Sequence, residues 1–175
     1  VCRPDHTFRG FQGQIESGEV KVGDEIVTLP SNERAHIKSI LVGDKDSQSA
    51  FMGQPVTLQL DKEVDVSRGC VIASGNNLPI SKSFTATILW MDDEELTPGT
   101  DYLVKLGTKQ IPGILKNIQY KIDVNTGEFI PAGQLKKNEI AVCDLDLQEP
   151  VVIDEFKKHK TLGELILIDR ISNMT

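Results

Sequence analysis

The feature that most constrains this fold is an alternation of polar and apolar residues with a period of two. It is clearest in the segment NIQYKID, residues 117–123, where Ile118, Tyr120 and Ile122 fall on one face. Successive side chains of a β-strand point to opposite faces of the sheet, so such alternation is typical of a half-buried strand. This segment is therefore predicted to be a strand with one face on a core.

Similar runs rich in Val, Ile, Leu and Thr recur along the chain, separated by turn residues such as Pro98-Gly99 and Asn125-Thr126-Gly127. The further predicted strands are residues 25–29, 35–41, 56–60, 84–91, 102–106, 140–147 and 164–169. Many short strands at intervals of about 8 to 12 residues indicate antiparallel barrels or sandwiches. A helix-like fragment is expected only near residues 154–160, so the predicted fold class is all-β.

A polar segment near the middle, IASGNNLPISKS at residues 72–83, divides the 175 residues into two parts. We therefore expect two consecutive small antiparallel β-barrels, one over residues 1–79 and one over residues 80–175. The chain begins at Val1 without an initiator Met or a secretory signal pattern. We expect it to be a piece of a longer polypeptide.

Charge and cysteine content exclude several classes of protein. The formal net charge of −7 argues against nucleic-acid binding through the overall field, because neutralising phosphates requires clustered Lys and Arg. No apolar run approaches the roughly 18 residues of a membrane-spanning helix. The three cysteines form no CxxC pair, which argues against a disulfide framework or a zinc site and favours a cytoplasmic location.

The stretch GQIESGEV, residues 13–20, has the glycine spacing of a phosphate-binding loop, GxxxxGK[ST]. Glu19 and Val20 occupy the places of the lysine and the hydroxyl residue. A carboxylate there would repel a polyphosphate. We interpret the stretch instead as a turn between two strands, with Ile15 and Val20 directed to the core.

No catalytic centre is visible in the sequence. The chain has no GxSxG elbow, and the carboxylate run at residues 92–95 lacks the spaced ligands and glycine of a calcium loop. That run is predicted to be a solvated hairpin loop, the basic run at residues 157–160 a solvated turn, and Trp90 a core or interface residue. We assign no catalytic residue, cofactor-binding residue or metal ligand to this chain.

The order of motifs resembles that of translational GTPases related to elongation factor Tu. The residues Gly13, Ile15, Gly18, Val20, Gly23, Asp24 and Ile26 match a hairpin pattern of that family's second domain. Downstream, AFMGQPVTLQLDKEVDVSRGCVI resembles the closing strands of the same domain, and LKKNEIAVCDLDLQEPVVIDEF resembles its third domain. The resemblance implies two barrels of the domain II and domain III types.

Three segments point to a narrower group within this family; they are RPDHTFRGFQGQIESG, VSRGCVI and GELILIDRISNMT. They are similar to the large, GTP-binding subunit of bacterial sulfate adenylyltransferase (ATP sulfurylase), including forms fused to adenylylsulfate kinase. Two residues depart from the pattern: Gln12 replaces a small residue and Cys70 replaces the usual Asp.

This resemblance implies which parts the chain lacks. GTP and Mg²⁺ would be held by a GTPase domain outside these residues, and adenosine 5′-phosphosulfate would be formed on a separate small catalytic subunit. The implied partners are the chain's own GTPase domain, that small subunit and, in fused forms, an adenylylsulfate kinase domain. The chain itself is expected to be a non-catalytic link that transmits the GTP state.

Phe8, Arg9, Gly10, Phe11 and Arg68 are the candidate interface residues, because aromatic rings and guanidinium groups are frequent at interface centres. The competing interpretation is that both Phe side chains pack the barrel, that Gly10 only turns the chain, and that Arg68-Gly69 forms the turn before a strand. Two other functions stay open: an elongation- or initiation-factor fragment that binds an RNA end through its first barrel, and a small independent enzyme.

Overall fold

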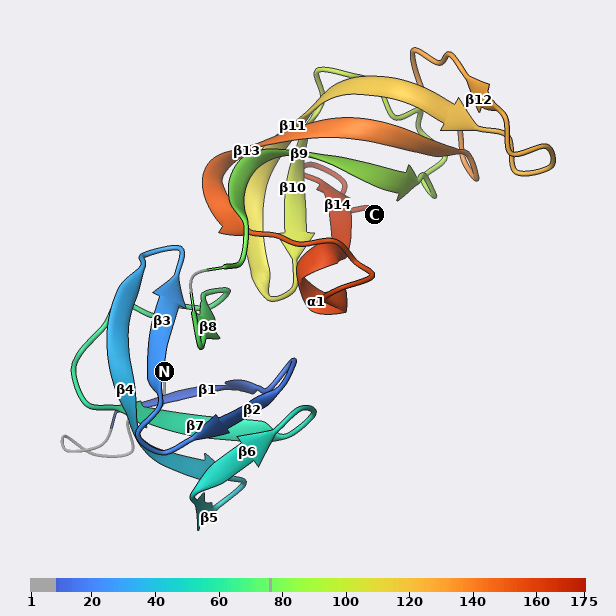
Figure 1. Cartoon of the computed structure of the whole chain (residues 1–175). Helices are drawn as coiled ribbons and strands as arrows, with labels where there is room; N and C mark the ends of the chain where they lie inside the picture. The colour runs from blue at the N-terminus through green and yellow to red at the C-terminus, as the bar shows by residue number, and fades with distance from the viewer. Residues whose placement is uncertain (1–8, 76) are drawn as a thin grey trace. The chain divides into compact units, whose positions relative to one another are not determined.

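The computed structural model describes residues 9–75 and 77–175, and the regular secondary structure of this part of the chain is almost entirely β (Figure 1). The elements in chain order are β1 (Gly10–Gln14), β2 (Glu19–Lys21), β3 (Glu25–Leu29), β4 (Glu33–Val42), β5 (Lys45–Ser47), β6 (Ser49–Phe51), β7 (Pro55–Leu60), β8 (Val71–Ala73), β9 (Ile80–Leu89), β10 (Asp101–Leu106), β11 (Lys109–Ile122), β12 (Phe129–Ile130), β13 (Ile140–Val152), α1 (Lys160–Gly163) and β14 (Leu165–Asp169). Neighbouring strands pair antiparallel. The all-β, antiparallel fold class is confirmed.

The chain folds into two compact units. The first contains the residues up to Pro79 together with Val152–Gly163, and the second contains Ile80–Val151 and Glu164–Thr175. The sequence-based division gave all residues from 80 onward to the second barrel. In the structure, residues 152–163 leave the second unit at the end of β13 and return to it at β14, and we call them the return segment.

The first unit is built on a sheet with the strand order β1-β7-β4-β3-β8, with β5 paired to β4 and a separate β2-β6 ladder. Alternate residues of these strands point into one apolar core, as the period of two predicts. The buried members of this core are Phe11, Ile26, Ala35, Ile37, Ile40, Ala50, Val56, Leu58 and Val64.

Strand β3 is buried on both faces, in contrast to the alternating strands beside it. Ile26 belongs to the core of the first unit, whereas Val27 and Leu29 pack with Val152 in a second apolar cluster that Leu162 also joins. The return segment therefore covers the outer face of β3. Its backbone is tied down where the amide of Ile153 donates a hydrogen bond to the carbonyl of Pro79 over 3.0 Å.

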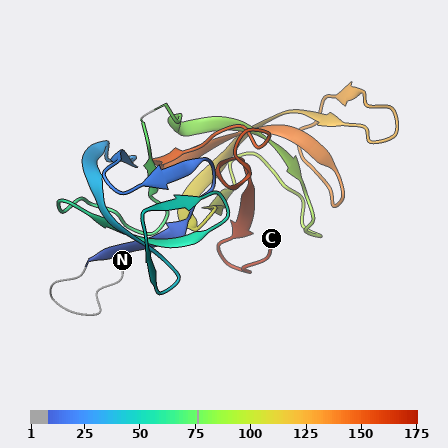
Figure 2. The same ribbon diagram turned by 60° about the horizontal axis from the view of Figure 1, so that its bottom comes forward.

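The second unit has the strand order β14-β10-β11-β13-β9, with β12 paired to the end of β11. Its most buried side chains include Leu96, Val104, Leu115, Leu135 and Cys143. Strands β11 and β12 form a hairpin that extends away from the rest of this unit in two views (Figure 1 and Figure 2). The aromatic rings of Tyr120 and Phe129 pack on it, 4.5 Å between centroids.

The helix lies later than the sequence suggested. Residues 156–158 form a turn, and α1 occupies Lys160–Gly163 instead of residues 154–160. The Asp154 carboxylate accepts hydrogen bonds from the amide of Glu155 and from the His159 ring, 2.8 Å each. Such side-chain bonds to the local backbone compete with helix formation, which explains the later start.

Candidate interface around Arg9 and residues 61–70

The GQIESGEV stretch does not form a hairpin. Strand β1 pairs with β7 and β2 pairs with β6, so the two strands that flank the stretch are hydrogen-bonded to different partners. Between them, residues 15–18 lie along the β6–β7 turn: the amide of Ile15 donates to Gln54 over 3.0 Å and the amide of Met52 donates to Gly18 over 3.0 Å. The stretch connects two strands, as predicted, but the β1–β2 hairpin that the resemblance implies is not formed, because β1 pairs with β7 and β2 pairs with β6.

Two details of that stretch were predicted correctly. Ile15 and Val20 pack against the core of the first unit. Gly18 adopts a φ of 72°, a left-handed conformation that side chains with a Cβ disfavour. Gly18 therefore serves a turn in the backbone.

Arg9 anchors the segment after β7 to the start of β1. Its Nη1 atom lies 3.2 Å from a carboxylate oxygen of Glu63, and its Nη2 atom donates a hydrogen bond to the carbonyl oxygen of Val64 over 3.2 Å. The guanidinium also lies over the Phe11 ring, 5.4 Å from its centroid. About a quarter of the side chain, 26%, remains exposed. These contacts give Arg9 a role within the barrel, and its contact with a partner stays a prediction.

The neighbours of Arg9 are mostly committed to the fold. Phe11 is buried in the core, and Gly10 stands inside β1 opposite Gln59, so Gly10 does not turn the chain. Phe8 lies outside the described residues. An interface role for Gly10 and Phe11 stays a prediction, and the Phe11 ring already packs in the core of the first unit.

Residues 61–70 lack strand structure but are held by side chains. The Asp61 carboxylate accepts hydrogen bonds from the backbone amide of His36 over 2.8 Å and from its ring over 3.1 Å. The backbone bond from His36 is the main cause that lowers the pKa of Asp61. Glu33 accepts a bond from the amide of Asp65 over 3.2 Å. Sequence reasoning missed these contacts because their partners are 25 and 32 positions apart.

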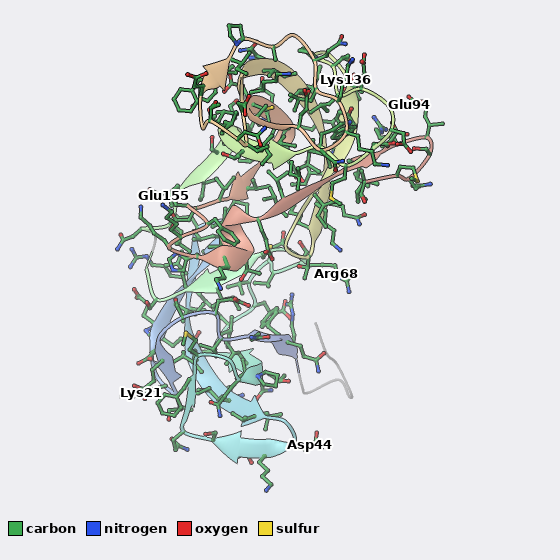
Figure 3. All side chains as sticks on the ribbon, turned by 90° about the vertical axis from the view of Figure 1, so that its right-hand side faces the viewer. Lys21, Asp44, Arg68, Glu94, Lys136 and Glu155 are labelled. Carbon is green, nitrogen blue, oxygen red and sulfur yellow. The ribbon has the colours of Figure 1, made fainter. Side chains whose placement is uncertain are left out.

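Arg68 is exposed on a turn, as Figure 3 shows. The amide of Cys70 donates to the carbonyl of Ser67 over 3.2 Å, and β8 begins at Val71, which confirms the predicted turn before a strand. Cys70 is half-buried, and its Sγ accepts a hydrogen bond from the Ser67 amide over 3.4 Å.

Trp90 and the carboxylate run, the other residues considered for a site, lie in the core and on the surface of the second unit. Trp90 packs edge-on against Tyr102 and its indole donates to the carbonyl of Glu94 over 2.6 Å, which confirms a core position. In the carboxylate run at residues 92–95, which includes the Glu94 labelled in Figure 3, Asp93 pairs with Lys137 over 2.7 Å. Among residues 9–75 and 77–175, no three Asp, Glu, His or Cys side chains gather as metal ligands. No helix in the described part is long and apolar enough to cross a membrane.

Comparison with known proteins places this fold. The family described as GTP-eEF1A C-terminal domain-like matches residues 83–175. The chain belongs to this family. A solved structure of Sup35 complexed with GDP matches 93% of the chain with a TM-score of 0.84, over 41% of its own length. At 23% identity, that match establishes a shared fold.

Two curated relatives of the chain are large subunits of sulfate adenylyltransferase, the narrower group that the sequence resembles. Sulfate adenylyltransferase subunit 1 of Teredinibacter turnerae is 42% identical over the whole chain, and that of Shewanella woodyi is 43% identical. The chain spans 38% of the length of both relatives. The predicted likeness to the large subunit of sulfate adenylyltransferase is confirmed.

Proposed function

We propose that this chain is the non-catalytic β-barrel part of a sulfate adenylyltransferase large subunit. In this role it couples GTP binding and hydrolysis to the reaction of ATP with sulfate, which gives adenosine 5′-phosphosulfate and pyrophosphate on the small subunit. The observation that carries the proposal is the match to sulfate adenylyltransferase subunit 1 over the whole chain at 42% identity.

The chemistry of the residues supports a coupling role rather than a catalytic one. Glu19 and Val20 stand where a phosphate loop needs Lys and Ser or Thr, so we assign GTP and Mg²⁺ to a GTPase domain of the parent polypeptide. The partners that we propose are that domain, the small subunit and, in fused forms, an adenylylsulfate kinase domain. The proposed location is the cytoplasm.

Coupling two distant sites requires a connecting part whose contacts differ in free energy between two states. Arg68 suits a contact of this kind, since its side chain is exposed on a hydrogen-bonded turn. Arg9 suits it less, because its guanidinium is already engaged by Glu63 and Val64. We therefore propose Arg68 as the first residue to test for contact with a partner.

The test uses the parent polypeptide with its small subunit and measures both association and GTP-stimulated adenylyl transfer. Arg68→Ala should reduce the stimulated rate while the basal rate of adenylyl transfer is kept. Lys62→Ala is the matched control, because Lys62 is an exposed cation of the same segment. Equal stimulation in wild type and Arg68→Ala would remove Arg68 from the interface.

Two outcomes would count against the proposed function itself. Turnover of ATP, GTP or sulfate by the purified chain alone would show an enzyme with its own active site. Retained binding of charged transfer RNA at moderate salt would favour a translation-factor fragment, although the net charge of −7 opposes phosphate binding.

A further inference from the structure

The outer face of the second unit has a hollow of about 460 Å³. Three strands that are adjacent in the sheet, β9, β13 and β11, form it. The residues that line the hollow come from these three strands and are Ser83, Phe84, Thr85, Lys116, Asn117, Asp144, Leu145 and Asp146. No step of the proposed function uses this hollow.

Two β-bulges give the hollow its polar rim. The register of β11 on β13 shifts between Leu115 and Asn117 and again between Ile118 and Tyr120, which leaves Lys116 and Gln119 as extra residues. Bulges redirect side chains and are frequent near functional sites. Here Lys116 pairs with Asp146 over 2.9 Å, and the Gln119 amide donates to Asp144 over 2.7 Å.

The two carboxylates of the hollow differ in how their charge is balanced. Asp146 has Lys116 as a counter-ion, whereas the bonds to Asp144 come from neutral groups: the Thr85 hydroxyl over 2.8 Å and the Gln119 amide. The hydroxyl of Thr85 is the main cause that lowers the pKa of Asp144, followed by Gln119. In the part of the chain that the structure describes, no Lys, Arg or His lies within ion-pair distance of Asp144. The charge of Lys116 also lowers the pKa of Asp144, but its ammonium forms its ion pair with Asp146, so the two carboxylates of the hollow share one lysine.

We propose that this hollow receives an arginine or lysine side chain of the small subunit, with Asp144 as its counter-ion. This inference rests on the proposed function, which makes the small subunit a partner. A guanidinium or ammonium group would supply the positive charge that Thr85 and Gln119 cannot, and hydrogen bonds between charged groups are stronger than neutral ones.

The lining of the hollow also has a place for the aliphatic stem of an arginine or lysine side chain. Phe84 is a half-buried apolar residue of the lining, whereas the side chain of Leu145 is buried in the core. The aliphatic stem of Lys or Arg packs on apolar surface while its charged end stays with polar groups. A free divalent cation fits less well, because it needs six or more oxygen ligands and no group of three ligand side chains exists in the described residues. The geometry thus favours a cationic side chain from a protein.

The experiment measures the affinity of the parent polypeptide for the purified small subunit by calorimetry at several salt concentrations. Asp144→Asn keeps the shape of the side chain and removes its charge, and it should weaken binding on the order of tenfold and flatten the salt dependence. Asp44→Asn is the matched control, since Asp44 is exposed on the turn between β4 and β5 (Figure 3). This control should bind like wild type, and the unfolding midpoint of each variant should lie well above the temperature of the binding assay.

The outcomes separate this inference from the proposed function. If wild type binds the small subunit and Asp144→Asn binds equally well, the inference is overturned and the proposed function stands. If wild type does not bind the small subunit at all, the proposed function fails first. Binding of MgCl₂ to the parent polypeptide alone that Asp144→Asn abolishes would also overturn the inference, because the hollow would then be a cation site.

Discussion

The guanidinium of Arg9 donates a hydrogen bond over 3.2 Å to the carbonyl oxygen of Val64, 55 positions later in the chain. Val64 is itself a buried member of the core of the first unit. The bond therefore fixes residues 61–70, which have no strand partners of their own, beside the start of β1. An arginine that the sequence suggests for a partner contact thus contributes to the internal structure of the barrel.

Arg9→Ala is expected to destabilise the chain by about 1–2 kcal/mol, because it removes a partly buried hydrogen bond and the packing on Phe11. Arg9→Lys should lower the free energy of unfolding by less, since it keeps the positive charge near Glu63. Urea unfolding of the three proteins measures these differences. Arg68→Ala serves as the control and should change stability by less than about 0.5 kcal/mol, as exposed substitutions usually do. An Arg9→Ala protein as stable as wild type would show that the contacts of Arg9 carry no net stabilisation.

Gly113→Ala is expected to destabilise the second unit by about 1–3 kcal/mol, the usual cost of overpacking a core. A Cβ atom at Gly113 would come within 2.7 Å of Leu147 Cδ2, 2.9 Å of Val104 Cγ2 and 3.1 Å of the carbonyl oxygen of Asp146. Val104 is β-branched and buried, so it has little freedom to move aside. Thermal unfolding monitored through Trp90 fluorescence reports on this unit.

Gly133→Ala is the matched control for that substitution. Nothing lies within 4 Å of a Cβ atom at Gly133, and its φ is not in the left-handed region. The melting temperature of Gly133→Ala should therefore stay close to that of wild type. Equal melting temperatures of Gly113→Ala and wild type would show that Leu147 and Val104 can shift at little cost.

The sequence predicts the strands of this fold better than it predicts which strands pair. The run at 117–123 is correctly predicted as strand because alternation is a local property, and it lies almost wholly within β11. The hairpin that the resemblance implies at residues 13–20 is not formed, because pairing depends on partners elsewhere: β1 finds β7, more than 40 positions away. The packing of the return segment on β3 could not be predicted for the same reason. The sequence of β3 does not show which distant residues cover its second face.

The same distinction holds for the candidate sites. The turn at Arg68 could be predicted, because Arg-Gly before an apolar pair is a local pattern. The hollow around Asp144 could not, since Thr85 and Asp144 are 59 positions apart and two bulges in β11 set the position of Gln119. Bulges depend on the partner strand, and the alternation of β11 alone does not reveal them.

Asp154→Asn should destabilise the first unit at neutral pH by loosening the return segment. The pKa of Asp154 is held below its usual range, mainly by the hydrogen bond from the His159 ring and next by that from the amide of Glu155. A carboxyl group with a lowered pKa in the folded state contributes stability that is present above its unfolded pKa of about 4 and is lost as the pH falls through the lowered value. The difference between wild type and Asp154→Asn should therefore be full at neutral pH and shrink below about pH 4.

Urea midpoints measured across this pH range test the dependence, and limited proteolysis within residues 152–163 tests its location. Asp44→Asn is again a suitable control, because its carboxylate is exposed on a turn. A difference between wild type and Asp154→Asn that stays constant from neutral to acid pH would show that the carboxylate charge is not what stabilises the return segment.

Cys143 is expected to resist alkylation in the folded protein, whereas Cys70 should react. Cys143 is buried in the second unit, and this burial raises its pKa to about 11. At pH 8 only about one thiol in a thousand would then be the reactive thiolate, and the reagent would still have to reach it. Iodoacetamide labelling followed by mass spectrometry should find Cys70 modified long before Cys143. In guanidinium chloride both should react at similar rates, because unfolding removes the burial that raises the pKa of Cys143. Equal labelling of the two cysteines in the folded chain would show that the second unit opens often enough to expose its core.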